Sequence, residues 1–221
     1  MCLMTAVYPA PWKLKGRGYI FLYNFPRRFE NDPYFKSNLT EQPFSGLGTI
    51  MLVDYEESDA GPYKELLFIP GEFTFLRKKY YSITKIYVST MESVENGRRN
   101  WGIPKEHADF EMIPLGGNKE RIIVKKDGTV FFDVTLKKRY IPFRVNTKYI
   151  SHAIVQKLED DTIYFTEFNG TGTAKLALLK SISCNEKYFP DICSVKPLVV
   201  TAISDFTIEF PEAEKILLLK K

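Results

Sequence analysis

The stretch Arg121-Ile-Ile-Val-Lys-Lys-Asp-Gly-Thr-Val-Phe-Phe-Asp-Val-Thr-Leu136 carries the strongest local structural signal in this 221-residue sequence. Two arms rich in β-branched and aromatic residues, which favour strands, flank Asp127-Gly128. That dipeptide tolerates the left-handed backbone conformations that a two-residue turn requires. The stretch therefore predicts a tight antiparallel hairpin.

Similar short apolar segments, bounded by glycine, proline and charged residues, fill most of the remaining sequence. Strands are expected at residues 18–25, 48–55, 64–69, 80–88, 162–168, 174–179 and 195–210. A second hairpin is expected where Gly170-Thr-Gly172 joins residues 162–168 to residues 174–179. So many strands need their edges closed, which favours an antiparallel β-barrel with a few short helices. At this length we expect one domain over residues 1–221.

One short helix is expected after the strand at residues 80–88. Ser89 followed by Glu92 fits a capping box, and Gly97 is a typical helix terminator. The pattern predicts a helix over residues 90–96. Residues 26–48 contain scattered prolines without a clear period and predict irregular structure with one short helix.

Composition is ordinary for a globular protein, with 44% hydrophobic and 26% charged residues and a formal net charge of +4. Two basic clusters, at residues 77–79 and 137–139, do not form the concentrated basic face that nucleic-acid binding needs. We interpret them as solvated ends of strands and loops, and nucleic acid is not an expected partner.

Cysteine and histidine are too sparse to predict a cofactor or metal site. Cys2, Cys184 and Cys193 are an odd number at no metal-site spacing, and His107 and His152 lie far apart. Neither a disulfide framework nor a bound cofactor is expected.

The N-terminal residues do not resemble a signal peptide, because Pro9, Pro11 and Lys13 interrupt any apolar run. No later segment is apolar for long enough to span a bilayer. A cytoplasmic location without membrane association is therefore expected.

Lys105 is the candidate reactive residue. It follows the rigid, apolar run Trp101-Gly-Ile-Pro104. Most lysines are solvated surface residues, and that interpretation applies here if Lys105 points outward. If it points inward, burial disfavours the charged amine and leaves a neutral nucleophile.

Glu65 stands near the start of a strand made mostly of hydrophobic residues. A carboxylate at that position is either an edge residue facing water or a group turned into a pocket. The sequence alone leaves both possibilities open.

Three motifs in a fixed order give the chain a resemblance to the acetoacetate decarboxylase family. They are Arg17 before the first strand, the turn Gly61-Pro-Tyr-Lys-Glu65, and the segment Gly97-Arg-Arg-Asn-Trp-Gly-Ile-Pro-Lys105. A weaker likeness continues through residues 176–179 and 197–204, so nearly the whole chain is covered.

The resemblance implies a cone-like antiparallel barrel whose interior holds Lys105. There the lysine would form an imine with a small keto acid, and the imine would accept the electrons left by departing carbon dioxide. Arg17 and Glu65 match pocket residues of the family. Arg17 could pair with Glu65 or orient a substrate carboxylate, and Glu65 could position the substrate or shuttle a proton.

The same resemblance gives the neighbouring residues supporting roles. Trp101 is expected at the substrate, and Arg98 is expected to brace the loop that carries Lys105. Family decarboxylases have a second lysine directly after the reactive one, and here Glu106 takes its place. Consecutive residues of an extended segment point in opposite directions, so Glu106 is expected to face away if Lys105 faces the pocket.

Two functions remain open on the sequence. One is an enzyme that acts on a keto acid by decarboxylation or by related aldol or dehydration chemistry. The alternative is a non-catalytic barrel of the same fold that binds a small apolar or carboxylate ligand. The family is known for oligomers, so the chain could self-associate.

Overall fold

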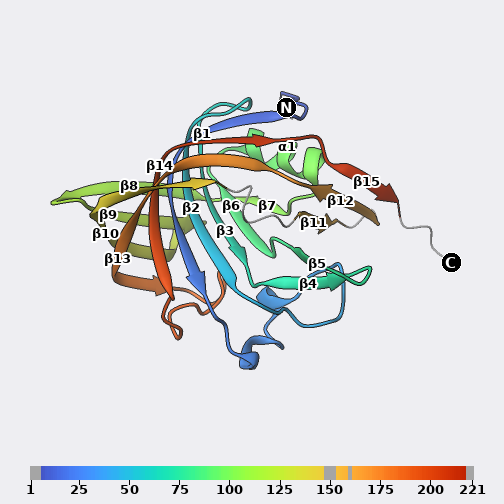
Figure 1. Ribbon diagram of the computed structural model, residues 1–221, viewed down its shortest axis with the longest axis horizontal. Helices are drawn as coiled ribbons and strands as arrows, with labels where there is room; N and C mark the ends of the chain where they lie inside the picture. The colour runs from blue at the N-terminus through green and yellow to red at the C-terminus, as the bar shows by residue number, and fades with distance from the viewer. Residues whose placement is uncertain (1–5, 147–152, 159–160, 218–221) are drawn as a thin grey trace.

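The computed structural model describes residues 6–146, 153–158 and 161–217. A strongly curled ten-stranded sheet dominates the molecule (Figure 1). Its strands, in spatial order, are β7 (Lys105–His107), β6 (Lys85–Val88), β3 (Tyr63–Ile69), β2 (Gly48–Glu57), β1 (Trp12–Tyr23), β14 (Val199–Phe210), β13 (Asn169–Cys184), β10 (Thr129–Asn146), β9 (Lys119–Lys126) and β8 (Asp109–Gly116). The neighbours pair antiparallel except β6 and β7, which run parallel.

A smaller five-stranded sheet lies beside the large one. Its strands, in spatial order, are β15 (Glu214–Leu217), β12 (Thr162–Thr166), β11 (Ile154–Lys157), β5 (Lys78–Tyr81) and β4 (Glu72–Phe75). The described chain also has one α-helix, α1 (Met91–Trp101), and two short 3-10 helices, Arg27–Phe29 and Pro33–Phe35. The prediction of a mainly β, largely antiparallel fold with few helices is confirmed.

The two ends of the large sheet are joined by one residue. Ala108 alone separates β7 from β8, and its N–H donates to the Val88 carbonyl at 3.0 Å. One continuous stretch of chain therefore pairs first with β6 and then with β9. Through Ala108, the two end strands of the curled sheet, β7 and β8, form one continuous segment.

The two faces of this sheet carry different cores. Tyr19 on β1 hydrogen-bonds Glu120 on β9 across the curl, although three strands lie between β1 and β9 in the sheet, so these side chains lie on the concave face. Phenylalanines and aliphatic residues of β1, β9, β10 and β13 fill that face. The convex face packs against α1 and the smaller sheet through a second cluster that includes Trp12, Ile86 and Tyr164.

The hairpin predicted at Asp127-Gly128 joins β9 to β10, and both turn residues have positive φ, 51° and 74°. The second predicted hairpin is wrong. Residues 162–166 form β12 in the small sheet, whereas residues 169–184 form β13 in the large one. The two segments belong to different sheets because β12 pairs with β11 and β15, and β13 pairs with β10 and β14.

The strand predicted at residues 80–88 is two strands, β5 and β6, separated by Ser82, Ile83 and Thr84. The polar side chains between the two strands form hydrogen bonds with residues 34 and 37. The Thr84 hydroxyl donates to the Tyr34 carbonyl at 2.6 Å, and the Ser82 hydroxyl interacts with Ser37.

Helix α1 is longer than predicted. Thr90, not Ser89, caps it by accepting a hydrogen bond from the Ser93 N–H at 3.3 Å. The helix continues through Gly97 and ends at Gly102, whose φ of 62° suits glycine. Across the described residues, no helix combines the length and apolar character needed to cross a membrane.

Candidate active site at Lys105

Lys105 is buried between the convex face of the large sheet and α1. It opens β7 opposite Ile86 of β6, and its side chain is 4% exposed. The Arg98 Nε donates to the Lys105 carbonyl at 2.9 Å, which fixes the backbone at this point. Of the two orientations left open by the sequence, the structure shows the buried one, and Lys105 points to the face of the sheet opposite that of Glu106.

Glu65 lies directly beside the lysine. The Lys105 Nζ is 3.0 Å from Glu65 Oε2, and the glutamate side chain is 5% exposed. Glu65 sits in β3 between Val53 of β2 and Val88 of β6, so its flanking neighbours in the sheet are apolar. Of the two possibilities left open by the sequence, the structure shows the buried one.

Two hydroxyl groups complete the surroundings of the amine. Lys105 Nζ donates to Ser93 Oγ at 3.0 Å and lies 3.4 Å from the Tyr63 hydroxyl. The nitrogen also lies 4.9 Å from the centre of the Tyr63 ring. An ammonium has three N–H donors, and Glu65, Ser93 and Tyr63 offer one acceptor each.

The second carboxylate oxygen of Glu65 is held by Tyr55, whose hydroxyl donates to Oε1 at 3.3 Å. Burial, followed by the charge of Glu65, raises the pKa of both Tyr55 and Tyr63 well above 10.0. Both tyrosines are therefore neutral hydroxyl groups at neutral pH. They can donate or accept a hydrogen bond without carrying charge.

Helix α1 covers the lysine stem closely. A Cβ atom on Gly97 would lie 2.6 Å from Lys105 Cδ, closer than side chains pack. Ser93 and Gly97 are four residues apart in the helix and so share the face that contacts Lys105. Ser93 belongs to none of the sequence motifs, although its spacing of four residues from Gly97 could have indicated this shared face.

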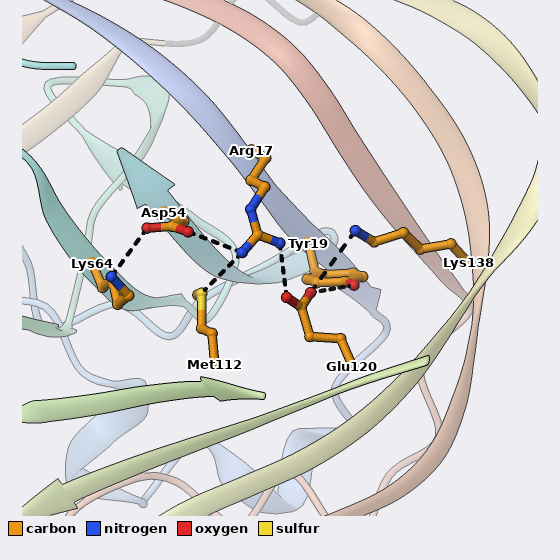
Figure 2. A network of polar contacts seen from close by, with 7 residues as sticks. All are labelled: Arg17, Tyr19, Asp54, Lys64, Met112, Glu120 and Lys138. Carbon is orange, nitrogen blue, oxygen red and sulfur yellow. Dashed lines mark hydrogen bonds and ion pairs between the residues drawn. The ribbon is translucent and has the colours of Figure 1, made fainter. Parts of the chain in front are cut away.

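Arg17 lies on the opposite face of the sheet, in a separate polar network (Figure 2). Its guanidinium is 3.0 Å from Asp54 Oδ2 and 2.8 Å from Glu120 Oε1. Lys64 also reaches Asp54, at 3.3 Å, and the Tyr19 hydroxyl donates to Glu120 at 2.7 Å. Arg17 therefore does not pair with Glu65, which was one of the two roles left open for it, and its role toward a substrate stays a prediction.

Strand register explains the separation. Arg17 pairs in register with Asp54, and Asp54 pairs with Lys64. Glu65 follows Lys64 in the same strand, so its side chain points to the other face. The sequence motifs match the family in order, but they do not reveal on which face each side chain lies.

A model of the acetoacetate decarboxylase family matches residues 38–160, more than half of the chain. The chain belongs to the acetoacetate decarboxylase family. A search of curated proteins found no match.

Solved structures support the family fold across nearly the whole chain. Acetoacetate decarboxylase from Legionella pneumophila superposes with a TM-score of 0.72 at 12% identity, covering 97% of this chain and 90% of that one. An acetoacetate decarboxylase-like enzyme from Sphingomonas wittichii RW1 gives 0.64 at 13% identity, with coverages of 99% and 98%.

The enduracididine biosynthesis enzyme MppR shares the fold as well. Its structure with the condensation product of pyruvate and imidazole 4-carboxaldehyde gives a TM-score of 0.64 at 11% identity, covering 94% of this chain and 89% of MppR. A further MppR structure contains pyruvate. At such identities these neighbours establish the fold.

Glu106, which replaces the second lysine of family decarboxylases, points away from Lys105. Its carboxylate bridges Lys85 of β6 and Lys126 of β9 on the concave face. Burial acts to raise the Glu106 pKa, but the hydrogen bonds from Lys126 and Lys85 outweigh it and hold this pKa below 4.5. Glu106 therefore links the two strands on either side of the sheet junction.

Trp101 is part of the aromatic core next to α1. Its ring meets those of Trp12 and Phe210 edge to face, each at 4.9 Å between centroids. The indole N–H donates to the Pro211 carbonyl at 2.6 Å. The hydrogen-bonding group of Trp101 is thus already used within the protein, and its role toward a substrate stays a prediction.

Proposed function

We propose that this chain is an enzyme that acts on a small keto acid through an imine formed at Lys105. The observation that supports the proposal best is the buried contact of Lys105 with Glu65, Ser93 and Tyr63. A lysine is rarely buried, because removing an ammonium from water is costly unless partners compensate it. Three converging polar groups in an apolar space are typical of a site organised for chemistry.

The proposed reaction begins when the Lys105 amine attacks the substrate carbonyl. Loss of water gives an iminium ion, which withdraws electrons from the adjacent carbon. Decarboxylation at that carbon, or aldol and dehydration chemistry through the same intermediate, then follows. The pyruvate complex of MppR supports a keto acid as the ligand, since that protein has the same fold.

Glu65 is the proposed acid and base of this reaction. It can take a proton from the Lys105 ammonium, because Oε2 lies 3.0 Å from Nζ. When the iminium ion forms, Glu65 in its ionised state again faces a cation. Arg17 does not enter the proposed chemistry, because it belongs to the network on the opposite face.

The test is reduction with borohydride in the presence of a panel of small keto acids, followed by mass spectrometry of the intact protein and its peptides. We expect one adduct, on Lys105, and none in Lys105→Ala. Lys64→Ala is the matched control, since Lys64 lies one residue from Glu65 on the other face. Failure of the folded wild-type protein to give an adduct with any keto acid would overturn the proposal.

A binding module of the same fold is the second candidate. The observation that favours it is that Lys105 already has a full set of partners and is 4% exposed. This alternative predicts saturable binding of a small carboxylate that persists in Lys105→Ala. A cytoplasmic location, expected from the sequence, is common to both proposals.

A further inference from the structure

We propose that Ser93 is a catalytic residue that, together with Tyr63, transfers a proton from Lys105 to the departing oxygen during imine formation. This inference rests on the proposed function, because it concerns the same reaction at the same amine. It assigns a role to α1, which none of the sequence motifs suggested.

The contacts of the amine come from two elements. Glu65 and Tyr63 belong to β3, whereas Ser93 belongs to the first turn of α1. Ser93 is 0% exposed, and its Oγ is as close to Nζ as the Glu65 carboxylate is, both at 3.0 Å. The Tyr63 hydroxyl lies 3.4 Å from the same nitrogen. Nζ thus contacts both hydroxyls.

The proton balance of imine formation requires more than one transfer. An ammonium and a ketone give an iminium ion and one water, so two of the three ammonium hydrogens leave with the carbonyl oxygen. One forms the hydroxyl of the carbinolamine, after the nitrogen has bonded to the carbonyl carbon. The other converts that hydroxyl to water as the carbon–oxygen bond breaks.

Glu65 can carry one of these protons. It faces Lys105 with Oε2 only, because Oε1 accepts the hydrogen bond from Tyr55. Glu65 would have to release the first proton before it could accept the second, so another group within reach of Nζ can carry the second transfer. A serine hydroxyl can accept a proton from nitrogen while passing its own to a neighbouring oxygen, so its own charge does not change.

Helix formation does not explain the Ser93 hydroxyl. The N-cap is Thr90, whose side chain accepts from the backbone N–H of Ser93, so the Ser93 side chain is not needed for capping. A fully buried hydroxyl is unfavourable unless it has partners. Its hydrogen-bond partner here is the reacting nitrogen of Lys105 itself.

The test compares the rates of adduct formation with pyruvate, trapped by borohydride at successive times, in wild type, Ser93→Ala and Ser93→Thr. Loss of the relay is expected to slow Ser93→Ala about 100-fold, the usual size of one acid–base contribution, without changing the final adduct yield. Ser93→Thr keeps a hydroxyl and is expected to retain most of the rate. Alanine favours helices, so Ser93→Ala is expected to fold, which the urea midpoint checks.

The outcomes are distinguishable. If the wild type gives no adduct, the proposed function itself fails. If the wild type reacts and Ser93→Ala reacts at the same rate, the role of Ser93 is wrong while the function stands. If Ser93→Ala and Ser93→Thr slow equally, packing rather than the hydroxyl is responsible, and the inference is also overturned.

Discussion

Lys105 and Glu106 are consecutive residues with opposite surroundings. Lys105 faces α1 and the Glu65 carboxylate, and Glu106 faces two lysines across the curl of the sheet. The replacement of the family's second lysine therefore does not place a carboxylate on the reactive amine. It places a carboxylate between two strands that would otherwise present like charges to each other.

The pH dependence of stability tests this role of Glu106. Its pKa is lowered below 4.5 in the folded protein, so the folded state binds fewer protons than the unfolded state in that range. The stability that Glu106 contributes is present above pH 4.5 and is lost as the pH falls through its folded pKa. We expect the difference in free energy of unfolding between wild type and Glu106→Gln to shrink below pH 4.5.

Urea unfolding at several pH values measures that difference. Glu111→Gln is the control, because Glu111 pairs with Lys125 at an exposed position and is expected to change stability little. A difference that does not vary with pH would contradict the role given to Glu106.

Some residues of the candidate site could be predicted from sequence motifs. The sequence pointed to Lys105 and Glu65, and the structure shows them in contact. It also pointed to Arg17, but a one-residue step along a strand moves a side chain to the other face. The registers of β1 against β2 and of β2 against β3, which decide these faces, could not be predicted from a sequence pattern.

Helix α1 packs closely against the Lys105 side chain and shields it from solvent. Gly97 is normally unfavourable inside a helix, costing about 1 kcal/mol relative to alanine. Here the space of its missing side chain is occupied by Lys105 Cδ and Cε. Substrate can reach the amine only if α1 or its neighbours shift.

Gly97→Ala is expected to destabilise the protein by about 1–2 kcal/mol, because overpacking outweighs the gain in helix propensity. It is also expected to displace Lys105 and reduce the keto acid adduct. Chemical denaturation and adduct yield measure the two effects. Met91→Ala, at an exposed position of the same helix, is the control and is expected to leave both nearly unchanged.

Among the strands, a hairpin defined by its own turn residues could be predicted from the sequence. The pairing of segments that are distant in sequence could not. Asp127-Gly128 defines its own hairpin, so β9 and β10 could be predicted. Residues 162–166 and 169–184 are neighbours in sequence but join different sheets, which depends on partners far along the chain. The predicted helix ended too early because glycine often terminates a helix. In the structure Gly97 lies inside α1, where Lys105 packs against it.

Across the whole molecule, the Arg17 network connects distant parts of the large sheet. Arg17 on β1 contacts Asp54 on β2 and Glu120 on β9, and Lys138 on β10 lies 3.9 Å from the same glutamate. The burial of Glu120 would raise its pKa, but hydrogen bonds from Tyr19 and Arg17 lower it. The network thus holds a charged carboxylate inside the curl.

Arg17→Gln separates a structural role from the substrate-binding role implied by the family. We expect the free energy of unfolding to fall by about 2–3 kcal/mol, because Glu120 loses its closest cation. The adduct yield per folded molecule is expected to stay unchanged. Lys15→Gln removes an exposed ion pair with Glu57 and is the control, with a change of less than about 1 kcal/mol.

The opposite result would restore the family expectation. If Arg17→Gln keeps its stability but loses the adduct, Arg17 acts on the substrate and does not stabilise the barrel.

The fold class could be predicted from the turn residues and the composition of the strands. The closing of the sheet through Ala108 could not, because it depends on which strands β7 and β8 meet in space.

The pairing of β1 with β14 has a consequence for synthesis of the protein. Trp12 lies opposite Phe210, so the first strand obtains this neighbour only after residue 210 has left the ribosome. Until then, one edge of β1 and much of the concave aromatic core remain exposed, and unpaired strand edges of this kind aggregate. We therefore expect truncated nascent chains that end before residue 199 to depend on chaperones, and chains that extend past residue 210 to be released from them.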